Sequence, residues 1–124
     1  MTPNPDPDPK VDFTVRAKAK TANHPWVNEG HSVGYTINGS EGLTLTLIRG
    51  VAYVFEIQIS GHPFYISSDD TGVGADEIID GVVGIMKENG LLQFTPNSNH
   101  PDLLYYQCGI HPKMGYNQYC RPLG

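Results

Sequence analysis

The sequence predicts a single all-β domain, folded as a β-sandwich or barrel with Greek-key connections. Two observations lead to this prediction. Apolar and polar residues alternate with a period of two in many short segments, as they do in strands with one buried face. Turn-forming residues, mainly Gly, Pro and Asn, separate those segments at short intervals. The chain has 124 residues, enough for one hydrophobic core, and we expect about eight strands around it.

Four of the expected strands lie in the first half of the chain. Residues 11–15 alternate between apolar and polar, and residues 33–37 do the same until Asn38-Gly39, a strong turn signal. Leucines alternate with threonines in residues 43–47. Residues 53–59 place several apolar side chains on one face, which predicts a strand packed against the core.

The second half supplies the remaining strands. Residues 64–67, 91–94 and 103–108 form short apolar segments, and a weaker one covers about 116–120. Residues 71–89 differ, because glycine recurs there too often for a long helix. We expect this segment to be a long connection with one helical turn.

Composition and charge limit the possible partners. The formal net charge of −5 gives the chain no electrostatic attraction to nucleic acid or to an anionic membrane surface. No stretch approaches the roughly 18 apolar residues that span a bilayer. We therefore expect a monomeric domain with neither a nucleic-acid partner nor a membrane span. No Ser-His-Asp set or carboxylate pair stands in a motif context, so we do not expect an enzyme.

Residues 1–10 form a Pro- and Asp-rich segment in which proline alternates with polar residues. Such a segment is stiff and extended, and it is typical of a linker. We interpret it as a flexible linker that joined a signal sequence or lipid anchor to a domain at residues 11–124, and we expect a periplasmic or otherwise exported protein. An ordinary disordered terminus is the alternative.

The strongest functional motif is Cys108-Gly-Ile-His111-Pro-Lys-Met114, which places a thiolate, an imidazole and a thioether within seven residues. Soft sulfur ligands combined with imidazole favour copper over magnesium or calcium. The motif follows a predicted strand, so one tight loop would present three ligands. His62 lies between two other predicted strands, where a neighbouring loop could supply a fourth ligand.

These residues carry a resemblance to a known superfamily. Residues 104–115 resemble the ligand loop of cupredoxins, and the Cys-x2-His-x2-Met spacing with Pro after His is similar to the amicyanin type. Gly61-His62-Pro63-Phe64 resembles the segment that carries the first histidine ligand. The resemblance implies a cupredoxin sandwich with one type 1 copper ion, held by His62, Cys108 and His111 with Met114 as a weak axial ligand. It also implies one-electron transfer with a transient redox protein partner.

The chain departs from that pattern at three positions. Pro63 follows the first histidine and has no N–H to donate, so we expect weaker support of the Cys108 sulfur. Gln107 stands where plastocyanin has tyrosine. Cys120 has no role in the motif. Two alternative functions stay open: a copper carrier or storage module, and a metal-free binding domain of the same fold.

The two cysteines could instead form a disulfide, the usual arrangement in an exported protein. The strand register argues against it. If residues 109–114 form the loop, Cys120 lies about four residues beyond the point opposite Cys108, roughly 13 Å away. A disulfide needs Cα atoms within about 7 Å of each other. We therefore expect Cys120 to be a free thiol in the monomer, or to pair only between chains.

The other histidines have weaker contexts. His24 and His100 each stand in an Asn-His-Pro sequence, which predicts a surface turn. We place His31 in the same surface class. A second metal site formed by His24 and His31 is the less favoured alternative.

Overall fold

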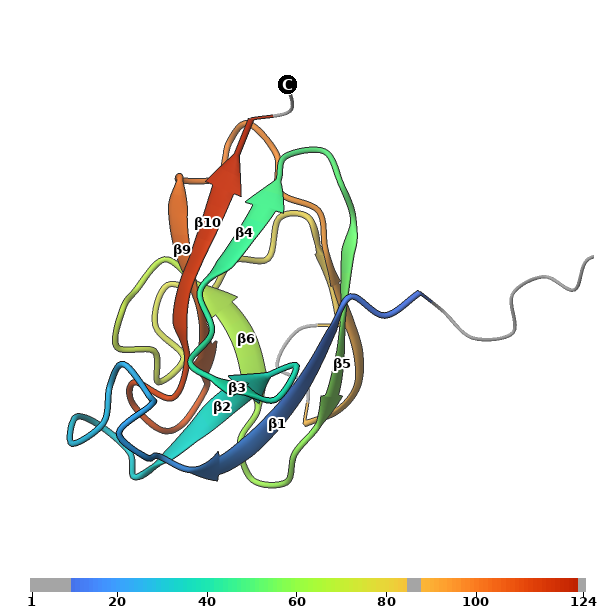
Figure 1. Cartoon of the computed structure of the whole chain (residues 1–124). Helices are drawn as coiled ribbons and strands as arrows, with labels where there is room; N and C mark the ends of the chain where they lie inside the picture. Colours follow the sequence, from blue (N-terminus) through green and yellow to red (C-terminus); the bar gives the residue numbers. More distant parts are fainter. Residues whose placement is uncertain (1–9, 85–87, 123–124) are drawn as a thin grey trace, which may run out of the picture.

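The computed structural model describes residues 10–84 and 88–122. Ten strands in these ranges form two sheets that pack face to face (Figure 1). The larger sheet has the order β3 (Ser40–Glu41), β2 (Val33–Ile37), β1 (Phe13–Ala19), β5 (Tyr53–Gln58), β8 (Asn89–Phe94) and β7 (Val82–Val83). The smaller sheet has the order β4 (Leu45–Ile48), β10 (Tyr116–Arg121), β9 (Leu103–Cys108) and β6 (Phe64–Ser67). The predicted all-β sandwich is confirmed, with ten strands in place of about eight.

Both sheets are mixed. β1 pairs with β5 in parallel and β4 pairs with β10 in parallel, whereas the other neighbours are antiparallel. The chain passes from one sheet to the other between β3 and β4, β4 and β5, β5 and β6, β6 and β7, and β8 and β9. These crossings bring segments that are distant in sequence to the same end of the sandwich. In Figure 1 the loop between β9 and β10 lies beside the loop that follows β1.

The core consists of the inward side chains of both sheets. Phe64 lies at its centre, with ring centroids 5.4 Å from Tyr35, 5.5 Å from Phe55 and 6.0 Å from Tyr106. All four rings are fully buried. Phe64 is also the register partner of Cys108 between β6 and β9. The aromatic core therefore lies directly beneath the predicted ligands.

The helical turn expected in the 71–89 connection is wrong for the residues that the structure describes. Residues 71–84 contain no helical turn, and the chain instead forms an isolated bridge between Ser67 and Glu77 followed by the short strand β7. The cause is backbone conformation, because Gly72, Val73 and Gly74 all have positive φ angles of 52–94°, which a right-handed helix cannot contain. Residues 85–87 of the predicted connection lie outside the described residues.

His100 is not at the surface, as its turn sequence predicted, but 7% exposed. Its Nδ1 accepts the N–H of Asn97 at 2.9 Å, and its Nε2 lies 2.9 Å from the Asp80 carbonyl oxygen. A neutral imidazole offers one acceptor and one donor, and this environment satisfies both. The turn therefore folds its histidine inward.

The expected linker, residues 1–10, lies outside the description except for Lys10. Within the described ranges, no helix is long and apolar enough to cross a membrane. Cys108 and Cys120 are both buried and, as expected, form no disulfide with each other. The register explains this, since the Cys120 N–H donates to the carbonyl of Asp102 at the opposite end of β9 from Cys108.

Candidate metal centre

The three strong ligands predicted from sequence come from one pair of neighbouring strands. His62 precedes β6, and Cys108 is the last residue of β9. The strands are antiparallel and pair Phe64 with Cys108, so His62 lies beside the loop that leaves β9. The Gly109 N–H extends this pairing by donating to the Pro63 carbonyl at 2.8 Å. His111 is placed by the same loop.

The donor atoms of these side chains converge. Nδ1 of His62 lies 3.1 Å from Nδ1 of His111. The Cys108 sulfur lies 4.0 Å from Nδ1 of His62 and 3.7 Å from Nδ1 of His111. In the metal-free protein, the Nδ1–H of one imidazole can donate a hydrogen bond to Nδ1 of the other across the 3.1 Å separation.

The triangle fits a single ion. With bond lengths of about 2.0–2.3 Å, a trigonal site separates its two nitrogens by about 3.5 Å and each nitrogen from the sulfur by about 3.8 Å. The observed distances of 3.1, 3.7 and 4.0 Å lie within 0.4 Å of those values. Two imidazoles and a thiolate in this shape match the donor set that selects copper.

The Cys108 sulfur is fully buried, and the one backbone donor near it within residues 10–84 and 88–122 is the Ile110 N–H at 3.5 Å. Pro63 has no N–H, and its carbonyl accepts from Gly109. Buried Tyr35 supports the site from the core, since its hydroxyl donates to the His62 carbonyl at 2.8 Å. Burial, with a smaller effect of the neighbouring Cys108, raises the pKa of the Tyr35 hydroxyl, which stays a neutral donor.

Met114, the predicted axial ligand, is also fully buried. Its carbonyl accepts the Tyr35 N–H at 2.7 Å and lies 3.1 Å from Nε2 of His24. These contacts fix the Met114 backbone at the end of the ligand loop. The axial role of its sulfur stays a prediction.

His24 is 2% exposed, so the predicted surface turn is wrong here as well. Nδ1 of His24 accepts the Trp26 N–H at 3.0 Å, which assigns the proton to Nε2 and makes it the donor to the Met114 carbonyl. Burial lowers the pKa of His24, followed by smaller opposing effects of its neighbours. His24 therefore holds the ligand loop as a neutral imidazole and is not joined with His31 in a second site.

His31 is the site residue that the sequence analysis missed. Its ring stacks on His111 with centroids 4.0 Å apart and an interplanar angle of 28°, and lies 5.5 Å from the His62 ring. Each of the three histidines offers a nitrogen within 4.8 Å of the others. The residues next to His31 form no motif that predicts a metal site. His31 lies in the loop after β1, and only the packing of this loop brings it to the site.

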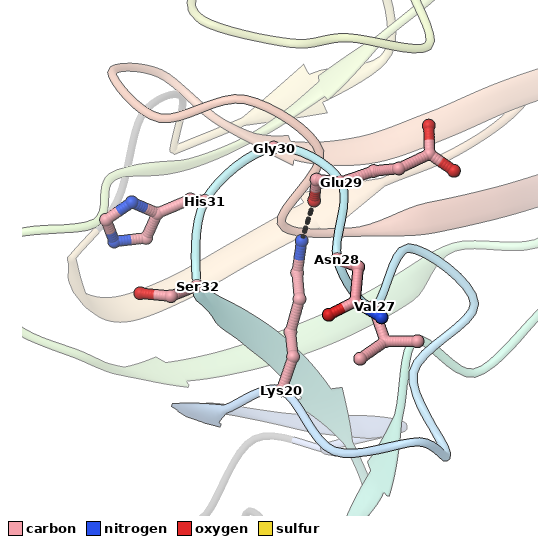
Figure 2. Close-up of a pocket in the computed structure, with 7 residues that line it drawn as sticks. All are labelled: Lys20, Val27, Asn28, Glu29, Gly30, His31 and Ser32. Atoms are coloured by element: carbon pink, nitrogen blue, oxygen red, sulfur yellow. Dashed lines mark hydrogen bonds between the residues drawn. The ribbon is translucent and has the colours of Figure 1, made fainter.

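The loop that carries His31 borders a cavity of about 250 Å³ (Figure 2). The Lys20 ammonium reaches into the loop and donates to the carbonyls of Glu29 at 2.7 Å and Trp26 at 3.1 Å. In Figure 2 the His31 imidazole projects from the opposite side of the loop, away from Lys20. His31 thus belongs to both the lining of the cavity and the histidine cluster, while Lys20 lies on the cavity side alone.

The half-buried histidines favour the neutral form. Burial lowers the pKa of His62, and the neighbouring His111 lowers it further. Burial likewise lowers the pKa of His31, with added effects of His111 and His62. Neutral imidazoles keep a lone pair available for a metal at neutral pH.

The sequence matches the model of the At5g54830-like domain family over residues 7–119. The chain belongs to this family. A similar protein of Arabidopsis thaliana, "Cytochrome b561, DM13 and DOMON domain-containing protein At5g54830", is 36% identical over 91 residues, which cover 64% of this chain and 10% of that protein. The chain thus spans about a tenth of the length of this relative. No solved structure matches.

The At5g54830-like domain of this chain contains the whole candidate centre. The matched range begins before β1 and ends within β10, so it includes every residue of the ligand loop together with His31 and His62. Cys120 lies one residue beyond the match.

Proposed function

We propose that this chain is a mononuclear copper protein that transfers single electrons. The observation that carries the proposal is the triangle of His62, Cys108 and His111, whose donor atoms lie 3.1–4.0 Å apart. Copper would supply the one-electron couple between Cu(I) and Cu(II). The donor set supports copper because thiolate and imidazole are the ligands it prefers, and Met114 is the proposed weak axial ligand.

The protein residues would serve electron transfer by holding the ligands still and excluding water. The Cys108 sulfur is buried on the aromatic core, and the Tyr35 hydroxyl fixes the backbone of His62. Fixed ligands lower the reorganisation that accompanies a change in oxidation state. His111 is only partly buried, and the neighbouring Ile110 is 58% exposed. Electrons would enter through this edge from a protein partner that docks transiently.

The comparison with known proteins supports a redox setting. The name of the Arabidopsis relative includes cytochrome b561. We propose on this basis that the partner of the copper centre is a haem protein or a haem domain. Electron transfer does not require a catalysed reaction, so we propose an electron carrier and not an enzyme.

Titration of the purified protein with Cu(II) tests the proposal. We expect one ion per chain and an intense visible thiolate-to-copper absorption. Cys108→Ser should abolish the absorption, because a hydroxyl oxygen cannot replace the soft Cu–S bond. Cys120→Ser is the matched control, since Cys120 is a second buried free thiol away from the centre, and should keep the colour. A wild-type protein with reduced thiols that stays colourless would refute the proposal.

A second measurement separates electron transfer from copper storage. The copper-loaded protein is mixed with a reduced small cytochrome, and oxidation of the haem is followed by stopped flow. Fast reversible exchange is the expected result. Copper binding without exchange would instead favour a carrier or storage module, whereas failure to bind copper would favour a metal-free binding domain.

A further inference from the structure

His31 lies in the histidine cluster but outside the ligand set proposed above. It could be another ligand of the same ion, or it could hold one of the ligands, His111, in place. The geometry of the three rings distinguishes these roles. This inference rests on the proposed copper site.

Two imidazoles that bind one ion hold their ring centres about 3.2 Å from it, and therefore about 5 Å from each other at ordinary ligand angles. His62 and His111 fit this arrangement, with centroids 4.8 Å apart and ring planes at 54°. His31 and His111 do not, because their centroids are 4.0 Å apart and their planes are within 28° of parallel. The in-plane lone pairs of nearly parallel rings do not converge on one point. His31 is thus placed as a stacking partner of His111.

The stack is held by contacts between two loops. The His31 N–H donates to the Pro112 carbonyl at 2.9 Å, one residue after His111. Gly30 allows this approach, since a Cβ at that position would lie 2.6 Å from the same carbonyl oxygen and the backbone has a φ of +67°. The Lys113 ammonium lies 3.9 Å from the centre of the Trp26 ring, which adds a cation–π contact between the loops.

We propose that His31 is a positioning residue of the copper centre, which covers one face of the His111 imidazole and fixes its plane. A ligand ring with one face packed has less freedom to rotate away from the ion. The stack should therefore slow the loss of copper and help set its reduction potential, although His31 makes no bond to the metal. From the usual strength of aromatic pairs, we expect its removal to speed copper release roughly three- to tenfold.

Two substitutions separate stacking from ligation. His31→Phe retains a flat ring without a nitrogen, whereas His31→Ala removes the ring. The copper-loaded proteins are mixed with excess EDTA, and the decay of the visible absorption is timed. We expect His31→Ala to release copper roughly three- to tenfold faster with a shifted potential, and His31→Phe to stay near the wild-type rate. Ser32→Ala, an exposed change in the same loop, is the control and should match the wild type.

A ligand role would give a different pattern, because Phe and Ala would then release copper equally fast and both would alter the absorption spectrum. That result, or a wild-type release rate in His31→Ala, would overturn the inference while leaving the copper proposal intact. The stack is also tested without metal. In the apo protein, NMR should show ring-current shifts of the His111 ring protons that His31→Ala removes and His31→Phe retains. Their absence would overturn the stack even if the wild type binds no copper, whereas failure to bind copper refutes the proposed function itself.

Discussion

Gly115→Ala should disrupt the end of the ligand loop more than any exposed glycine change. Gly115 follows Met114 and immediately precedes β10. A Cβ on Gly115 would lie 1.5 Å from the Tyr106 carbonyl oxygen and 2.6 Å from its carbonyl carbon. Real Cβ atoms stay at least 3.0 Å from such neighbours, so the loop must move away from β9 by about 1.5 Å.

The cost follows from what that movement breaks. Tyr116, the next residue, pairs with Tyr106 at the start of the β9–β10 ladder. Losing about two ladder hydrogen bonds at roughly 1 kcal/mol each, together with about 2 kcal/mol of steric strain, gives a destabilisation of about 4 kcal/mol. This is a large part of the roughly 5–15 kcal/mol that typically holds a domain together.

Urea denaturation followed by tyrosine and tryptophan fluorescence measures this loss, provided the slope of the unfolding free energy is unchanged. Gly50→Ala is the control for a glycine change that meets no neighbouring atom. Gly50 has a φ of +89°, and no atom lies within 4 Å of the point that an alanine methyl group would occupy, so this variant measures the backbone strain alone, about 1–2 kcal/mol. Equal losses in the two variants would refute the argument that the approach of Tyr106 requires glycine.

Three further perturbations probe the core, the axial position and the buried histidine behind the ligand loop. Gln118→Met should stabilise the fold by about 1–3 kcal/mol in thermal unfolding, because the buried Gln118 amide has no hydrogen-bond partner among the residues described; a lower midpoint would contradict this. Met114→Leu should keep the copper colour and shift the potential in voltammetry; an unchanged potential would count against the axial role. Acidification of the apo protein from about pH 7 to 5 should lower its stability, because burial lowers the pKa values of His24, His31 and His62 and the unfolded chain then takes up these protons first. His24→Gln should reduce that dependence in urea titrations at each pH; an unchanged dependence would exclude His24 as a contributor.

Local pattern was enough to predict the strands that matter most for the site. The bounds predicted for β2, β6 and β9 match the structure, because period-two alternation or a short apolar run ends there at strong turn signals. The helical turn expected in the 71–89 connection was wrong, since a run of positive φ angles there depends on contacts such as the Val73 N–H to the Cys108 carbonyl. The conformational propensities of neighbouring residues cannot reveal a hydrogen-bond partner that lies 35 positions away.

The same division applies to the histidines. His62 and His111 were predicted because a short motif and a neighbouring strand suffice to place them. His24 and His31 were misplaced because their environment comes from the ligand loop, about 90 and 80 residues further along the chain. An Asn-His-Pro sequence looks the same whether its imidazole faces water or a carbonyl. Only the packing of the loop after β1 against the loop after β9 distinguishes the two cases.

The candidate centre is positioned by protein contacts, and this predicts a folded apo protein with a preformed site. The register of β6 and β9 places His62 and Cys108, the Tyr35 hydroxyl holds the His62 backbone, and the aromatic core packs beneath them. None of these contacts needs an ion, in contrast to small zinc domains that fold only with metal. Copper should therefore leave the far-UV circular dichroism unchanged and raise the thermal midpoint only through its binding free energy, which grows with the logarithm of the free copper concentration. An apo protein without cooperative unfolding, which gained its strands only on adding copper, would show that the metal builds the site and that the strand register does not.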